Sequence, residues 1–343
     1  MAVHKLKEFL LYLISENIKK AIILKPENIN YFLEAVCPSY SYLVFDIEKD
    51  KIILKVPEME YENAVFFSTK YISVEIRENN IKEDLRYCNG VEDSFPIKYL
   101  KYIDKDFKII SEKLNQIKSI KNNNEIKLIK KACLISDKAI EYGAELVLNS
   151  QKPITENELA SEIEYFMKKN GGLKPSFGTI AISDYKTSLP HGIPSDNTIK
   201  NILLMDIGTI YNGYCSDITR TIVLNKNDRK YVEIYNIVEN AKLEVEKNLK
   251  EGVSVNELHN IAINEMGEYS KYFKHSLGHG VGVEVHEYPS LSNKLENDII
   301  LKENMVITIE PGIYLHNDFG VRIEDMYLIK KNKFEKLSNA KYY

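Results

Sequence analysis

Two strand-like segments joined by Asn212-Gly213 limit how this 343-residue chain can fold more than any other pattern in it. Asn-Gly between apolar segments is the strongest short signal for a two-residue β-hairpin turn. With these residues as the turn, Asp206 on one strand faces Thr219 on the other. Asp217 lies two residues before Thr219, so it shares a face with Asp206 at a diagonal distance of roughly 7–8 Å. The hairpin therefore predicts two carboxylates that converge from neighbouring strands.

Convergent carboxylates repel each other, and each resists ionisation unless positive charge lies between them. Two metal ions about 3.5–4 Å apart would fill such a gap. The alternative is that Asp206 and Asp217 are unrelated strand acids, one paired with Arg220 and the other at the edge of the sheet. The hairpin alone leaves both interpretations open.

A glycine-rich segment carries three of the seven histidines of the chain: His275, His279 and His286. Glycines alternate with other residues in Gly278-His279-Gly280-Val281-Gly282, which lets the backbone or a ligand approach His279 closely. Imidazole is a common metal ligand and also a donor that stabilises a developing negative oxygen. The alternative is a glycine-rich turn with histidines on its surface.

A second pair of acids belongs to two strand patterns near the C-terminal end of the sequence. Glu310 follows the apolar segment 306–309, and Glu324 lies in the segment 320–325. A carboxylate at a buried strand end needs a counter-charge. Arg322 is two residues from Glu324 and on the same face of its strand, so a plain salt bridge is the alternative here.

Taken together, the acids suggest a metal centre through their total charge. Asp206, Asp217, Glu310 and Glu324 carry four negative charges, which two divalent cations would neutralise. Oxygen ligands with one imidazole, His279, favour Mn²⁺, Co²⁺ or Fe²⁺, are compatible with Zn²⁺ and argue against thiolate chemistry. We therefore expect two divalent ions on these five residues, Mn²⁺ or Co²⁺ first, with Fe²⁺ or Zn²⁺ as further candidates.

The order of helix and strand patterns predicts two domains. Short strands at 21–25, 42–47 and 51–56 alternate with helical segments, which is typical of an α/β domain. A long amphipathic helix over 124–148 then begins a region of helices and antiparallel strands, which indicates an α+β domain with one curved sheet. We place the N-terminal α/β domain at 1–121 and the catalytic domain at 122–343.

Composition excludes some classes of partner. Acidic and basic residues are mixed along the chain, with a net charge of −4 and a pI near 6.1, so no basic face suited to nucleic acid is expected. No segment has the eighteen or so uninterrupted apolar residues that a membrane span needs. The four cysteines stand far apart without a CxxC pair. They are expected to be buried free thiols in a cytoplasmic protein.

Read in order, four motifs resemble metallopeptidase family M24, which contains methionine aminopeptidase, aminopeptidase P and prolidase and has the "pita-bread" fold. The resemblance runs from about Asn124 to the C-terminus, and its motifs are MDIGTIYNGYCSDITRT, HSLGHGVGVEVHEYP, TIEPGIY and VRIEDM. It implies an α+β catalytic domain, with a curved antiparallel sheet flanked by helices, after a smaller creatinase-like α/β domain.

The resemblance also implies a role for each residue of the motifs. Asp206 would bind one metal ion, His279 and Glu310 the other, and Asp217 and Glu324 would bridge both. The remaining positions are expected to handle the substrate or orient the ligands: His191 and His286 in substrate binding and oxyanion stabilisation, His275 and Tyr314 lining the site, and Arg322 and Thr219 orienting the carboxylates.

Within the family, the ending Arg322-Ile323-Glu324-Asp325 is typical of the proline-specific branch. We therefore expect an Xaa-Pro dipeptidase (prolidase) that acts on small peptides with proline in the second position, and a homodimer. A hydroxide bridging the metals would attack the carbonyl, His286 would stabilise the oxyanion, and Glu310 would carry the proton to the leaving nitrogen.

Other activities on the same fold stay open at this point. Several prolidases have an arginine directly after HExP, where this chain has Ser290, so an Xaa-Pro aminopeptidase (aminopeptidase P) is the main alternative. A methionine aminopeptidase, a creatinase-like amidinohydrolase and a non-catalytic binding module are further ones. The complete set of five ligand positions argues against the last two.

Overall fold

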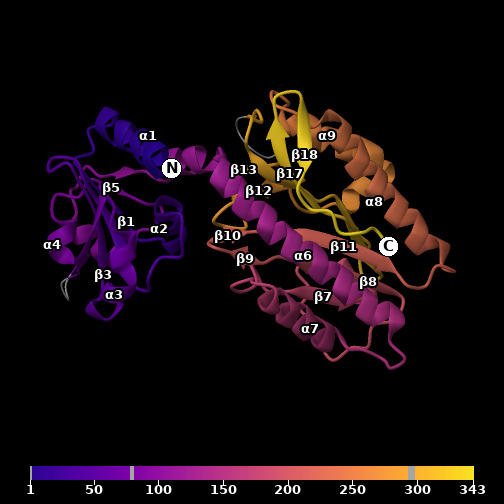
Figure 1. Ribbon diagram of the computed structural model, residues 1–343. Helices are drawn as coiled ribbons and strands as arrows, with labels where there is room; N and C mark the ends of the chain where they lie inside the picture. Colours follow the sequence, from indigo (N-terminus) through magenta and orange to yellow (C-terminus); the bar gives the residue numbers. More distant parts are fainter. Residues whose placement is uncertain (1, 78–80, 293–297) are drawn as a thin grey trace. The chain divides into compact units, whose positions relative to one another are not determined.

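The computed structural model describes residues 2–77, 81–292 and 298–343, which form two compact units, Met1–Lys118 and Ser119–Tyr343 (Figure 1). Within those residues, no helix combines the length and the apolar character that crossing a bilayer requires. All four cysteines are free. Three are buried as expected, but Cys37 is half-exposed, because it lies in the loop that follows the short helix over 26–33.

The N-terminal unit is a six-stranded mixed sheet with helices, as an α/β domain requires. Its strand order is β4-β3-β2-β1-β5-β6. The pairings β1-β2 and β2-β3 are antiparallel, and the pairings β3-β4, β1-β5 and β5-β6 are parallel. The elements are α1 (Ala2–Ser15), β1 (Lys20–Ile23), α2 (Pro26–Leu33), β2 (Tyr42–Asp46), β3 (Lys51–Val56), η1 (Glu58–Glu60), α3 (Tyr61–Ala64), η2 (Val65–Phe67), β4 (Ile72–Ile76), α4 (Lys82–Leu85), β5 (Gly90–Val91), η3 (Ile97–Tyr102), β6 (Lys108–Ile109) and α5 (Ser111–Ser119).

An aromatic cluster holds α1 and α2 on the sheet of this unit. Phe9 of α1, Phe32 of α2 and Phe45 of β2 are fully buried, with ring centroids 5.0–5.2 Å apart. Tilted and edge-to-face contacts at this spacing are the favoured geometry of aromatic pairs. The alternation of buried and partly exposed residues along β3 fits a strand with one covered face.

The second unit consists of helices packed on antiparallel strands. Its elements are α6 (Asn123–Asn149), α7 (Glu156–Lys169), β7 (Ile180–Ser183), η4 (Asp184–Ser188), β8 (Ile202–Ile207), β9 (Ile210–Tyr211), β10 (Tyr214–Cys215), β11 (Ile218–Val223), α8 (Arg229–Asn248), α9 (Val255–Met266), η5 (Gly267–Tyr272), β12 (His279–Gly280), β13 (Glu287–Ser290), β14 (Val306–Ile309), β15 (Gly312–Tyr314), β16 (Gly320–Arg322), β17 (Asp325–Lys330) and β18 (Lys333–Lys336).

Capping boxes explain why α6 and α7 begin where they do. The side chain of Asn122 accepts hydrogen bonds from the N–H groups of Asn124 and Glu125, and Glu125 bonds back to the N–H of Asn122. Thr155 and Glu158 repeat this arrangement at α7. Each box satisfies amide groups that a helix start would otherwise leave unpaired.

The Asn212-Gly213 turn has the predicted register. Asn212 and Gly213 have φ angles of 46° and 84°, and Asp206 on β8 pairs with Thr219 on β11. The hairpin is interrupted between β8 and β9. A side chain at Gly208 would lie 2.0 Å from the carbonyl oxygen of Ser216, so this close approach accepts only glycine.

The strands form several hydrogen-bonded groups instead of the one continuous sheet expected. A three-stranded sheet has the order β11-β8-β7, a five-stranded sheet has the order β13-β12-β14-β17-β18, and β9-β10 and β15-β16 are two-stranded ribbons. Helices lie on both sides of this assembly (Figure 1). Side chains of α6 and α7 share a core with β7, β8 and β11, whereas α8 and α9 share one with β14 to β17.

Candidate active site

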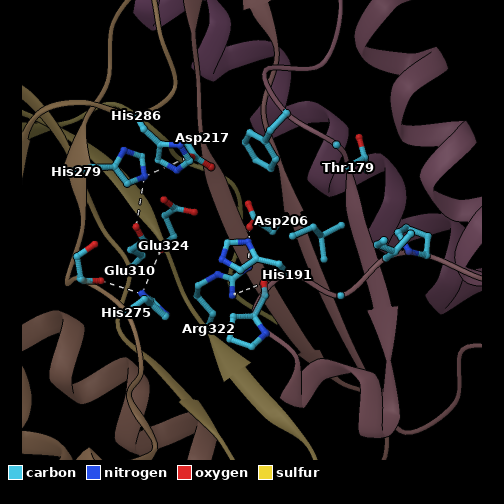
Figure 2. A pocket seen from close by; sticks show the side chains of 18 of the residues that line it. Thr179, His191, Asp206, Asp217, His275, His279, His286, Glu310, Arg322 and Glu324 are labelled. Carbon is cyan, nitrogen blue, oxygen red and sulfur yellow. Dashed lines mark hydrogen bonds and ion pairs between the residues drawn. The ribbon is translucent and has the colours of Figure 1, made fainter. Parts of the chain in front are cut away.

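Five predicted ligand residues line one cavity of the second unit, with a volume of about 590 Å³ (Figure 2). They come from separate places in the sequence, and each stands on or directly beside a strand: Asp206 on β8, Asp217 before β11, His279 on β12, Glu310 after β14 and Glu324 before β17. The convergence that the hairpin and the later motifs predicted is therefore present.

The ligand atoms of these residues lie close enough together to bind shared metal ions. His279 Nε2 is 3.3 Å from Glu310 Oε1 and 3.5 Å from Asp217 Oδ2. Ligand atoms lie within 4.8 Å of one another in two overlapping groups, Asp206 with Asp217 and Glu324, and His279 with Glu310 and Glu324. A third such group joins His286 to Asp217 and His279. Two adjacent ions sharing Glu324 would match the overlap.

Two carboxylate oxygens in the cavity indicate whether these residues are suited to bind metal ions. Asp206 Oδ1 and Glu324 Oε1 are buried and have no hydrogen-bond partner among the residues that the structure describes. A buried charge without a partner is costly, so such oxygens are expected only where a ligand completes them. Oxygen-rich donors with one imidazole are a set that divalent transition metals accept. The residues therefore fit the ions that the sequence predicts.

The metal-free carboxylates also resist ionisation. Burial, together with the charges of the neighbouring acids, holds the pKa of Asp217 and that of Glu324 well above the usual range. Burial and the charge of Asp206 raise the pKa of Glu310 to about 8, against the opposing effect of Arg322. Without cations, the cluster thus retains protons at neutral pH.

The candidate ligand His279 is neutral, and its Nε2 faces the acids of the cluster. Burial and the nearby His286 lower the pKa of His279 to about 3. Its Nδ1 lies 3.1 Å from the carbonyl oxygen of Gly280, to which it donates, so Nε2 carries the lone pair that faces Glu310 and Asp217. A side chain at Gly278 would lie 2.1 Å from the carbonyl oxygen of Thr308. Glycine there lets the segment that carries His279 lie close to β14.

Arg322 and Thr219 each donate a hydrogen bond to a carboxylate of the cluster. Arg322 Nη2 donates to Asp206 Oδ2 at 2.6 Å, and Thr219 Oγ1 donates to Glu324 Oε2 at 2.8 Å. The alternative pairing of Arg322 with Glu324 is wrong, because Asp206 reaches the guanidinium from the neighbouring sheet. The alternative pairing of Arg220 with a hairpin acid is also wrong. Arg220 is instead buried, and its Nη2 lies 2.7 Å from Asp325 Oδ1.

Residues 127–331 match the sequence profile of metallopeptidase family M24. This segment is more than half of the chain and contains all five candidate metal ligands. The chain belongs to metallopeptidase family M24.

The similarity of this M24 protein to its relatives extends over nearly the whole chain. An uncharacterized peptidase of Methanocaldococcus jannaschii is 52% identical over 343 residues, which cover 98% of this chain and 96% of the relative. The solved prolidase from Pyrococcus furiosus is 38% identical, with a TM-score of 0.88 and coverage of 97% and 99%. The X-Pro aminopeptidase from Thermotoga maritima is 30% identical, with a TM-score of 0.81 and coverage of 95% and 97%. The expected pita-bread fold and peptidase class are thereby confirmed.

Three of the remaining predicted residues, His191, His275 and His286, line the same cavity, whereas Tyr314 is buried against His275 and is not among the lining residues. His275 Nε2 accepts a hydrogen bond of 2.7 Å from the hydroxyl of Tyr314, which in turn accepts one from Arg322. Burial lowers the pKa of His275 to about 4, so this histidine is neutral. His191 and His286 line the cavity and are exposed. The ring of His286 packs edge-on against that of His279, with centroids 4.3 Å apart.

Sequence reasoning missed one residue of the site and one wall of the cavity. Thr308 Oγ1 accepts the N–H of His279 and contacts Glu310, and its position two residues before Glu310 on a strand could have indicated this. An apolar part of the cavity wall consists of Phe177, Ile180, Ile193 and Pro194. These apolar residues carry no pattern that separates them from ordinary core residues.

Proposed function

We propose that this chain is a metal-dependent Xaa-Pro dipeptidase that hydrolyses the bond before proline in small peptides. The observation that carries the proposal is the convergence of Asp206, Asp217, His279, Glu310 and Glu324. Two of their oxygens are buried without a partner in the described part of the chain. Similarity to the prolidase from Pyrococcus furiosus over nearly the full length of both chains supports the substrate class.

These five residues would hold two divalent cations, with Mn²⁺ or Co²⁺ as the proposed native ions. Bound cations polarise the peptide carbonyl and lower the pKa of water. The other steps belong to the side chains. Glu310 would take the proton of the attacking water and pass it to the proline nitrogen. His286 would donate to the carbonyl oxygen and His191 would bind the substrate, because both line the cavity and are exposed.

Removal of one ligand tests the proposal. We expect Glu324→Ala to lose metal and to lower kcat/KM on Met-Pro by more than about 100-fold, because the cluster depends on each of its charges. Glu335→Ala, an exposed glutamate of β18, is the matched control and should leave both unchanged. Metal content by elemental analysis and activity are measured together. An active, metal-free Glu324→Ala protein would refute the assignment.

A second activity, Xaa-Pro aminopeptidase, is favoured by one feature of the cavity. Among the described residues that line it, Arg322 is the only arginine or lysine, and its guanidinium nitrogens bond to protein groups. Ser290 also lines the cavity. The free carboxylate of a dipeptide would thus meet no available arginine or lysine among these residues, so a longer peptide without a carboxylate at that position would lose little binding free energy.

A substrate panel separates the two activities. Metal-loaded protein is assayed on Gly-Pro, Ala-Pro and Met-Pro beside Xaa-Pro-Yaa tripeptides and Met-Gly-Yaa. Preference for the dipeptides supports the dipeptidase, and equal activity on the tripeptides supports the aminopeptidase. Cleavage of Met-Gly-Yaa alone would instead indicate a methionine aminopeptidase.

Three further predictions accompany this proposal. Residues 122–343 would carry the chemistry, after a creatinase-like domain at 1–121. The protein would form a homodimer, which light scattering after gel filtration measures. A cytoplasmic location is the third, and fractionation of the source cells tests it.

A further inference from the structure

A buried ion pair joins Lys121, outside the cavity, to Glu287, which lines it, and neither residue has a part in the proposed chemistry. Lys121 Nζ donates to Glu287 Oε2 at 3.1 Å, and the two side chains are only 1% and 3% exposed. An exposed lysine–glutamate pair of the same unit, Lys130 with Glu335, is 42% and 45% exposed. Burying an ion pair costs desolvation free energy that the attraction often only offsets. Stability alone is therefore a poor explanation for Lys121 and Glu287.

The lysine end of this pair is fixed by its own backbone. The N–H of Lys121 donates to the carbonyl oxygen of Asn304 at 2.9 Å, and Ile120 forms a β-bridge with Met305. The next residue, Asn122, caps α6. The ammonium group is thus presented from a short segment that is anchored on both sides.

The side chain of Glu287 folds back over the turn that joins β12 to β13. Glu287 Oε1 accepts the N–H of Glu284 at 3.2 Å, and the N–H of Gly282 donates to the carbonyl oxygen of Glu284. The carboxylate also packs against Gly282, where a side chain would lie 2.3 Å from Oε2. His286 is the residue directly before Glu287 in this turn. A shift of the carboxylate would therefore move the backbone that carries His286.

We propose that Lys121 is a positioning residue, which fixes the turn of His286 through Glu287. The lysine is not among the residues that line the cavity, whereas Glu287 and His286 line it and the ring of His286 packs on that of His279. Holding the turn keeps the His286 imidazole over the cavity without contributing a ligand to the metal centre. The inference rests on the proposed function to the extent that His286 acts on the substrate.

Lys121→Met tests the proposal, because it keeps the length of the side chain and removes its charge. We expect kcat on Met-Pro to fall about 10- to 100-fold, the range in which partners of site residues act, while metal content stays at the wild-type level. Hydrogen exchange of the peptide that contains Glu284 should become faster, since its acceptor is no longer held. Lys130→Met is the matched control and should change none of these quantities.

Two more variants separate position from charge. Lys121→Arg keeps the cation and should retain kcat within about threefold of wild type, since guanidinium also pairs with carboxylate. Lys121→Met combined with Glu287→Gln removes both charges of the pair and keeps an acceptor for the N–H of Glu284. This double variant should regain the wild-type Tm but keep the lowered kcat, and it carries the test if Lys121→Met does not fold.

The outcomes divide clearly. A lower Tm with wild-type kcat and wild-type exchange of the turn would overturn the proposal, as would loss of metal from Lys121→Met or recovery of kcat in the double variant. If the wild-type protein cleaves no Xaa-Pro peptide, the proposed function fails instead. The exchange measurement then still decides whether Lys121 holds the turn: faster exchange supports the positioning role, and unchanged exchange overturns it.

Discussion

Arg322 is the residue on which the geometry of the site depends most. Its Nε donates to Thr219, its Nη1 to Tyr314 and to the carbonyl oxygen of Pro190, and its Nη2 to Asp206. Neighbouring negative charge and the tyrosine hydroxyl raise the pKa of Arg322 above its ordinary value despite burial. The planar guanidinium thus connects three parts of the site: the candidate ligand Asp206, the hydroxyl of Thr219 that bonds to Glu324, and the segment 190–194 that carries His191.

Arg322→Lys should show that the planar fork, and not the charge alone, is needed. An ammonium group has one nitrogen and cannot reach four acceptors in different directions. We expect kcat/KM to fall about 10- to 100-fold, with weaker metal binding, as for other partners of metal ligands. Arg229→Lys, on the exposed start of α8, is the control. Wild-type kcat/KM in Arg322→Lys would show that charge alone suffices.

At the level of single residues, the sequence predicted which groups meet but not every partner. Local periodicity places Arg322 and Glu324 on one face of a strand, and this suggested their pairing. The actual partner, Asp206, is 116 residues away. Which of two acids takes a guanidinium depends on how separate sheets approach each other, and strand periodicity does not encode that.

Among the structural elements, the Asn212-Gly213 turn was the most predictable. Both residues have positive φ angles, as a two-residue turn of this kind demands. Once the turn type is fixed, the period of two along each strand determines the rest of the register. The break between β8 and β9 could not be predicted in this way, because it arises from the contact of Gly208 with the backbone of Ser216.

Gly213→Val should destabilise the second unit. A β-branched residue in the left-handed region costs about 1–2 kcal/mol, which lowers the Tm of a unit of this size by about 2–8 °C. Calorimetry measures the shift. Asn212→Gly is the control, since glycine adopts positive φ freely, and its Tm should stay within about 2 °C of wild type. Equal shifts in both variants would contradict this explanation.

The segment that carries His191 is a second element whose position is set by buried charge. Lys186 Nζ donates to Glu156 Oε2 at 2.5 Å, to the carbonyl oxygen of Ile193 at 2.6 Å and to Ser195 Oγ at 2.9 Å. The cavity-lining segment 190–194 is thus held near its end by Lys186 and near its start by Arg322.

Replacing that buried pair by neutral residues should weaken substrate binding. We expect Lys186→Met with Glu156→Gln to raise KM about tenfold with little change in kcat, because the segment binds substrate and transition state alike. Metal content should be unchanged. Lys200→Met, an exposed lysine near the same loop, is the control. A fall in kcat at constant KM would assign Lys186 to the chemical step instead.

For the whole molecule, metal and protons compete for the same carboxylates. Glu310 has its pKa raised from 4.5 to about 8 in the folded, metal-free protein, and those of Asp217 and Glu324 are raised in the same direction. A group with a raised pKa in the folded state contributes stability that is fully present below its unfolded pKa. That contribution is lost as the pH rises through the folded pKa.

The metal-free protein should therefore lose stability between about pH 4.5 and 8, the interval between the unfolded and folded pKa values of Glu310. Bound cations reverse the trend, because they require deprotonated ligands and stabilise by about 2.7 kcal/mol at a hundredfold excess over Kd. We expect the difference in Tm between metal-loaded and chelator-treated protein to widen from pH 5 to 8. Scanning calorimetry of both forms measures it, with Glu310→Gln as the variant in which the metal-free slope is reduced. A Tm of the metal-free protein that rises over this interval would show that these carboxylates are already paired without metal.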